Sequence, residues 1–290
     1  MNEPKFSVII PTYHRNDLLR KCLECLKPGV QTFPAEEYEV IVSDDGCETT
    51  AEEMIREHYP WVKWAANSQD CKGIGSNRNN GVKYARGEWL AFTDDDCLPA
   101  VGWLSAYAEA CKGEALAFEG AIHPLGDPEQ DLAECPTNLT GGFCWGANMA
   151  IQRSLFEKLE GYDPNYLTYG HEDVDMKLRL IPFTTISFVP DAIVLHPVRI
   201  TTLKEVIVRM PHRCASWAFH VNKHREALGY SQAFSLTIEQ YKFHLLLLMR
   251  NFRAHRFQGA CGELAMLIVG IPLILIYLNR FERSDKHQAV

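Results

Sequence analysis

Two strongly apolar segments of this chain each end in a run of acidic residues. The segment YEVIVS (38–43) leads into DDG (44–46), and the segment WLAFT (89–93) leads into DDD (94–96). Short apolar runs rich in β-branched and aromatic side chains are typical of buried strands. In an open parallel sheet, ligands bind beyond the carboxyl ends of the strands. The pattern therefore predicts an acidic site at one edge of a sheet.

Carboxylates that are packed together repel one another unless a cation offsets their charge. Oxygen ligands of this kind suit Mg²⁺ or Mn²⁺, which commonly share a few carboxylates with phosphate oxygens. A diphosphate would complete such a site. Taken alone, residues 44–46 are equally well explained as a polar turn. Residues 94–96 follow a fully apolar strand, where a plain turn is the weaker explanation.

Strand-like and helix-like segments alternate as far as Pro197. This order predicts an α/β fold with an open, mostly parallel sheet that is covered by helices on both faces. The expected strands are 6–10, 38–42, 62–66, 88–93, 115–122 and 185–189. The expected helices are 16–26, 50–58, 76–86, 153–159 and 172–180.

Beyond this region the chain reads as helices at 201–228, 237–250 and 259–281. We therefore divide it into a catalytic domain, 1–200, and a helical extension, 201–290. The last helix contains the apolar run 264–278, which Glu263 bounds and basic residues flank on both sides. This pattern favours an interfacial or re-entrant helix pair over a membrane span. The alternative is a buried helix in a core or an oligomer contact.

The net charge of -8 argues against a nucleic-acid partner, which would require a basic face. Residues 1–5 lead directly into a strand pattern and do not resemble a signal peptide. We expect a cytoplasmic protein that is peripheral on the cytoplasmic face of the membrane. A nicotinamide oxidoreductase is disfavoured because the first strand is followed by PTYHRND, which lacks glycine.

Five motifs, in this order, resemble those of the inverting family 2 nucleotide-sugar glycosyltransferases. They are FSVIIPTYHR, VIVSDDG, GSNRNNGVKYARGEWLAFTDDD, GANMAIQRSLFEKLEGYDPNY and HEDVDMKLRL. The resemblance covers roughly residues 6–200 and implies the GT-A fold, with Asp94 and Asp96 forming the D-x-D motif. The chain beyond residue 200 shows no such match.

The resemblance implies a donor site and a metal site at the ends of the strands. Asp94 and Asp96 would ligate Mn²⁺ or Mg²⁺, with Asp96 the more direct ligand and His196 a further one. Asp44 or Asp45 would contact the nucleobase. The complete set of residues implied for the nucleotide-sugar is Pro11, Thr12, Tyr13, Arg15, Asp44, Asp45, Arg78, Asp94 and Asp95.

The resemblance also implies a catalytic base and an acceptor pocket. Asp173 would accept the proton of the acceptor hydroxyl, and Glu172 would orient the acceptor or the base. Acidic residues are also favoured in the first turn of a helix for electrostatic reasons alone. Trp145, Gly146 and Asn148 would form the floor of the acceptor pocket, although Trp and Gly serve equally well in packing and turns.

These features predict transfer of one sugar from a nucleotide-sugar, preferably a UDP-sugar, to a hydroxyl of a saccharide or lipid-linked glycan. The product would belong to cell-surface polysaccharide or glycolipid synthesis. The Q-x-x-R-W motif of processive synthases is absent from the sequence, which favours a single transfer. The alternatives are transfer to a polyprenyl phosphate and an inactive, membrane-docked scaffold of the same fold. One departure from the family is His171, which stands where many relatives have glycine.

Overall fold

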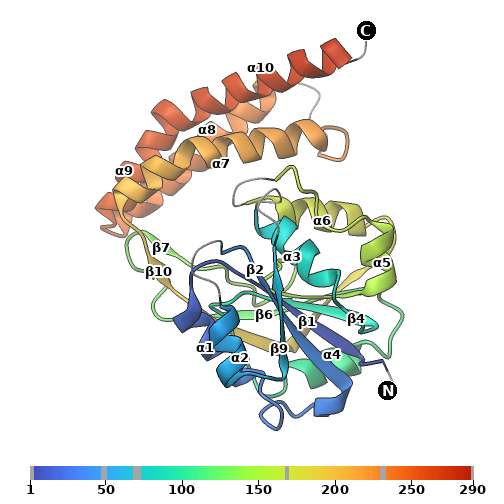
Figure 1. Ribbon diagram of the computed structural model, residues 1–290. Coiled ribbons are helices and arrows are strands. Elements are labelled where there is room, and N and C mark those ends of the chain that lie inside the picture. Colours follow the sequence, from blue (N-terminus) through green and yellow to red (C-terminus); the bar gives the residue numbers. More distant parts are fainter. Residues whose placement is uncertain (1–2, 47–50, 68–72, 167–169, 229–232, 289–290) are drawn as a thin grey trace. The chain divides into compact units, whose positions relative to one another are not determined.

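The computed structural model describes residues 3–46, 51–67, 73–166, 170–228 and 233–288 (Figure 1). The chain forms two compact units. Unit 1 comprises residues 1–126, 135–167 and 172–197, and unit 2 comprises residues 127–134, 168–171 and 198–290. Unit 2 thus includes two segments, 127–134 and 168–171, that the division at residue 200 assigned to the catalytic domain.

Unit 1 contains an eight-stranded sheet in the order β3-β2-β1-β4-β8-β6-β9-β5. Strands β1, β2, β3 and β4 run parallel to one another, and β6 runs parallel to β9. Strand β8 is antiparallel to both β4 and β6, and β5 is antiparallel to β9. The strands are β1 (Phe6–Thr12), β2 (Tyr38–Asp44), β3 (Val62–Ala66), β4 (Trp89–Thr93), β5 (Leu98–Pro99), β6 (Ala117–Leu125), β8 (Asn148–Gln152) and β9 (Ile186–Pro197). The predicted open, mostly parallel sheet is confirmed.

Alternate residues of the strands point to opposite faces of the sheet, and both faces are covered by helices. In β1, Val8 and Ile10 pack with α1 (Asn16–Cys25), α2 (Glu52–His58) and α4 (Trp103–Ala110). Ile9 belongs to the other core, together with α5 (Arg153–Lys158) and α6 (Glu172–Leu180). Helix α3 (Ile74–Val82) lies on this second face (Figure 1). Burial on both faces explains why the strands read as continuous apolar runs rather than alternating ones.

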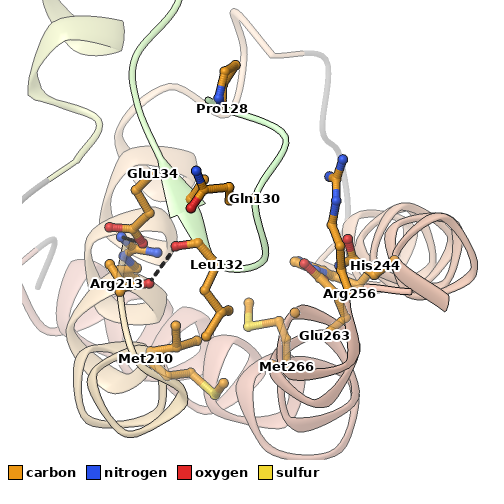
Figure 2. A pocket seen from close by; sticks show the side chains of 16 residues that line it. Pro128, Gln130, Leu132, Glu134, Met210, Arg213, His244, Arg256, Glu263 and Met266 are labelled. Carbon is orange, nitrogen blue, oxygen red and sulfur yellow. Dashed lines mark hydrogen bonds and ion pairs between the residues drawn. The ribbon is translucent and has the colours of Figure 1, made fainter. Parts of the chain in front are cut away.

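Unit 2 is mainly helical. It contains α7 (Leu203–Lys223), α8 (Ala233–Arg253), α9 (Phe257–Ala265) and α10 (Ile271–Gln288), with a π-helical turn at Met266–Gly270. Strands β7 (Ala133–Glu134) and β10 (Arg199–Ile200) pair next to the start of α7, which has a capping box formed by Thr202 and Glu205. A cavity of about 320 Å³ lies among α7, α8, α9 and the segment 128–134 (Figure 2).

Candidate active site

The two acidic turns meet at the carboxyl end of β1. Thr12, at the end of this strand, lies opposite Asp44 in the parallel register of β1 and β2. The Thr12 hydroxyl donates to Asp95 at 2.7 Å, and the Asp45 amide donates to the Thr12 carbonyl at 3.0 Å. Because β1 lies between β2 and β4, the turns after these two strands converge at the edge where ligands bind in open parallel sheets.

Arg15 joins this edge to the D-x-D motif. Its guanidinium pairs with the carboxylates of Asp95 and Asp96, at 2.8 Å in each case. Burial raises the pKa of Asp95 to about 7, and the charge of Arg15 opposes this rise. Tyr13 is 53% exposed and its ring contacts that of His14, whereas Pro11 is buried in β1. Tyr13 therefore presents an aromatic surface at the rim of the site.

Asp44 and Asp45 differ in their surroundings. Asp44 is 2% exposed and accepts hydrogen bonds from the amides of Gly46 and Ala51 and from the indole of Trp64. These bonds use both carboxylate oxygens, so Asp44 orders the turn after β2. Asp45 is only half-buried. Of the two acids expected to contact a nucleobase, Asp45 is the more accessible.

Arg78 is the central cation of the site. It lies on α3, is 1% exposed, and pairs with Asp94 at 2.9 Å, with Asp173 at 3.1 Å and with Glu172 at 3.7 Å. Burial alone would lower the pKa of Arg78, but Asp173 and the other two acids raise it well above its usual value. The family resemblance implies that Arg78 approaches the phosphates or the sugar of the donor. The structure instead surrounds its charge with the acids that follow β4 and begin α6.

The segment around Trp145 packs directly against this cation. A Cβ atom at Gly146 would lie 2.4 Å from the Cζ of Arg78, so only glycine fits at this position. The half-buried ring of Trp145 contacts that of Phe143, with centroids 4.7 Å apart. Trp145 and Gly146 thus lie beside the Arg78–Asp173 pair.

Asn148 has a different role from the one predicted. It is 1% exposed, and its side-chain oxygen accepts from Trp103 at 2.8 Å and from Tyr107 at 2.7 Å. Its amide nitrogen donates to the carbonyls of Ala121 at 2.8 Å and Ala192 at 2.7 Å. These four bonds use the whole amide and link β8 to α4, β6 and β9. Asn148 therefore supports the sheet, and we do not retain it as an acceptor ligand.

A group of potential metal ligands lies at the end of the D-x-D motif. Side-chain atoms of Asp96, Cys97 and His196 lie within 4.8 Å of one another, and the Nε2 of His196 is 3.5 Å from the Asp96 carboxylate. The Oδ1 of Asp96 is buried and accepts no hydrogen bond from the described residues. A buried carboxylate oxygen without a donor, next to an imidazole, fits a divalent cation such as Mn²⁺.

Glu119 was not identified from the sequence. It is 3% exposed in β6 and accepts hydrogen bonds from the amides of Phe143 and Cys144 at 2.9 and 2.7 Å. The side chain of Asn138 and the amide of Gly142 also donate to it. Glu119 thereby holds the loop that leads to Trp145. The one feature of the sequence that could have identified Glu119 is its position as a single acidic residue within the apolar segment ALAFEGAI.

Comparisons with solved structures show the same architecture. S. aureus TarS 1-349 in complex with UDP superimposes with a TM-score of 0.55 at 17% identity, covering 97% of this chain and 92% of that one. The mannosyltransferase PcManGT from Pyrobaculum calidifontis, in complex with GDP-Man and Mn²⁺, gives 0.54 at 19% identity and covers 99% and 76%. The fold is that of the GT-A nucleotide-sugar transferases.

Sequence comparisons relate the chain to known glycosyltransferases. Residues 7–123 match glycosyl transferase family 2, and residues 131–190 match the N-terminal domain of galactosyltransferase. Glycosyltransferase AglE of Haloferax volcanii is 27% identical over 210 residues, which cover 68% of each chain. GalNAc(5)-diNAcBac-PP-undecaprenol beta-1,3-glucosyltransferase of Campylobacter jejuni is 32% identical over 127 residues, covering 43% of this chain and 38% of that enzyme. The chain is a glycosyltransferase, and its similarity to family 2 covers residues 7–123.

Proposed function

We propose that this enzyme transfers a single sugar from a nucleotide-sugar, preferably a UDP-sugar, to an acceptor hydroxyl with inversion at the anomeric carbon. The observation that carries this proposal is the position of Arg78. One buried guanidinium pairs with Asp94 of the D-x-D motif and with Asp173, the candidate base. The residues suited to hold the leaving group and to activate the acceptor therefore belong to one electrostatic network.

In this mechanism Asp173 accepts the proton of the attacking hydroxyl. Burial raises the pKa of Asp173 and Arg78 opposes this rise. A raised pKa makes a carboxylate a stronger base, provided that Arg78 keeps it ionised. Glu172 is 6% exposed and shares Arg78, which suits it to orient the base. Trp145 offers an apolar surface to the sugar ring of the acceptor. A single displacement by this base inverts the anomeric configuration.

The donor is held at the edge formed by the turns after β1, β2 and β4. Tyr13 stacks on the nucleobase, Asp45 accepts from a base N–H, and Arg15 contacts the phosphates. Asp95 is 0% exposed and pairs with Arg15, so it orients Arg15 instead of contacting the ribose. Asp94, Asp96 and His196 would hold Mn²⁺ or Mg²⁺. A cation held there would supply positive charge to offset the negative charge of the departing nucleoside diphosphate.

For the acceptor we propose a saccharide or a lipid-linked glycan used in cell-surface polysaccharide or glycolipid synthesis. The Campylobacter relative is named for an undecaprenol-linked glycan, which supports an acceptor of this class. Such an acceptor places the enzyme in the cytoplasm, peripheral on the cytoplasmic face of the membrane. The alternative acceptor is a polyprenyl phosphate, and analysis of the product would distinguish it from a glycan acceptor.

The test combines nucleotide binding with product analysis. We expect calorimetry to detect UDP binding that depends on Mn²⁺, and mass spectrometry of donor and acceptor libraries to identify a single-sugar product. Asp173→Asn removes the base, so we expect kcat to fall by about 10²–10⁴-fold while UDP binding is retained. Glu109→Gln, an exposed acid on α4, is the matched control. Absence of Mn²⁺-dependent nucleotide binding would instead support an inactive scaffold.

A further inference from the structure

Helix α8 carries an apolar stripe that the described residues of the chain leave uncovered. Its five members recur every three or four positions, which places them on one side of the helix. They are 40–53% exposed: Ile238, Tyr241, Leu245, Met249 and Phe252. Monomeric soluble proteins rarely leave a continuous apolar surface of this extent in water, so the stripe calls for a partner.

The neighbouring helical segment has the same character. Residues Phe257–Arg280 have a mean hydropathy of 2.2 over their most apolar window, and 28% of that window is buried. Among the described residues, this is the one helix that is long enough and apolar enough to cross a membrane. Core helices of soluble proteins can have the same length and composition. Its exposed apolar residues are Phe257, Leu264, Ile268, Val269 and Ile276. A hydrogen bond of 2.6 Å between the Nδ1 of His244 and the carboxylate of Glu263 joins α8 to α9 (Figure 2).

The charges on these two helices identify the kind of partner. Residues 237–280 contain two acidic side chains, Glu239 and Glu263, against five basic ones: Lys242, Arg250, Arg253, Arg256 and Arg280. The whole chain has a net charge of -8, so this excess of basic residues is local. An anionic lipid surface complements an apolar face with basic flanks. A second copy of the chain would bring basic side chains against basic ones.

The first turn of the apolar segment is tied to a polar part of the chain. The amides of Gln258 and Gly259 donate to the carboxylate of Asp131, at 2.8 and 2.7 Å. Arg256 pairs with Glu129 on the same stretch, residues 127–134. Insertion of this end into a bilayer would break these bonds or carry several charges into the hydrocarbon.

The second half of the segment is tied to α7. Ile274 and Leu278 are buried against Cys214 and Ala218 of that helix. Helix α7 exposes Lys204, His212 and Arg213. If the segment crossed the membrane, α7 would be drawn into the bilayer with it, and charged side chains are strongly disfavoured in the hydrocarbon. The contacts at both ends of the segment therefore disfavour a position in which it crosses the bilayer.

We propose that α8 and the segment Phe257–Arg280 bind an anionic bilayer by lying in its interfacial plane, embedded on one side and not crossing it. The exposed apolar residues enter the boundary between head groups and acyl chains, and the basic residues contact anionic head groups. This inference rests on the proposed function, in which the acceptor is membrane-bound. It adds the lipid chemistry and the manner of attachment.

The first test is flotation of the full chain with lipid vesicles. We expect binding to vesicles that contain phosphatidylglycerol, little binding to pure phosphatidylcholine, and at least a tenfold loss of binding in the double variant Leu245→Glu/Met249→Glu. Leu139→Glu, which changes an equally exposed apolar residue of unit 1, is the matched control and should float normally. Equal flotation of the double variant, or a dimer that it converts to monomer, would overturn the proposal.

The second test separates lying in the plane from crossing. Ala254→Cys and Asn279→Cys place thiols just before the apolar segment and near its end without removing a basic side chain, and they are compared with the parent chain in sealed membrane vesicles. We expect a membrane-impermeant maleimide to add a label at both positions from the same side, whereas labelling at only one would show a span. Donor hydrolysis without vesicles should be unchanged in Leu245→Glu/Met249→Glu. Failure of docking can thus be told apart from failure of the proposed transferase activity.

Discussion

At the scale of single residues, the site depends on one buried cation that several acids share. Arg78 is separated in the chain by 95 residues from Asp173 and by 16 from Asp94, and it pairs with both. Removing one partner from a buried ion pair is costly because the remaining charge stays uncompensated. Gly146 completes this arrangement, since the guanidinium lies where a side chain at that position would be.

This arrangement predicts that Arg78→Lys lowers kcat by about a hundredfold, because a single ammonium cannot bridge two carboxylates as a planar guanidinium does. Gly146→Ala should produce a similar loss, because the added methyl group would displace the guanidinium of Arg78. Steady-state kinetics would measure both variants, with Arg153→Lys on α5 as the control. If Arg78→Lys retained full activity, Arg78 would not position Asp173.

At the scale of secondary structure elements, α7 contacts the loop that precedes α6. The ring of His171 stacks on that of His220 at 5.4 Å between centroids, and Ser216 donates to the carbonyl of Gly170 at 2.7 Å. His171 has a φ of 72°, a left-handed conformation that favours glycine. A glycine would adopt this conformation without strain, and His171 is held in it by its contacts with α7.

Burial lowers the pKa of His171 from 6.5 to about 4. Between these values the unfolded chain binds the proton more readily than the folded chain does, so the folded state loses stability as pH falls from 6.5 toward 4. His171→Asn tolerates the left-handed backbone and does not titrate, so we expect a smaller loss over this window. Thermal unfolding at several pH values would measure the difference. Parallel pH profiles of the two proteins would contradict the prediction.

At the scale of the whole molecule, the net charge of -8 conceals two different surfaces. Unit 1 gathers five carboxylates around two arginines: Asp94, Asp95, Asp96, Glu172 and Asp173. Unit 2 carries the apolar stripe with its basic flanks. An excess of acidic groups in the site favours binding of a divalent cation, and binding to the folded state alone raises its stability.

We therefore expect Mn²⁺ with UDP to raise the Tm by several degrees, since ligand at a hundred times Kd stabilises by about 2.7 kcal/mol. Asp96→Asn should abolish the increase, and EDTA should reverse it in the parent chain. Glu160→Gln, an exposed acid beyond α5, serves as the control. An equal increase of the Tm in Asp96→Asn would exclude Asp96 as a metal ligand.

The sequence by itself determined β1, β2, β3, β4, β6 and the start of β9, most of the helices, and the edge at which the acids gather, because hydrophobic periodicity and strand-end position are local properties. Helix α6 and strand β3 lie where the pattern predicted them. The short antiparallel strand β8 was missed, since its five residues acquire their role only between β4 and β6. Only the tertiary structure decided what Asn148, Glu119 and Arg78 contact. Their partners are distant in the chain, and burial becomes known only when the elements pack.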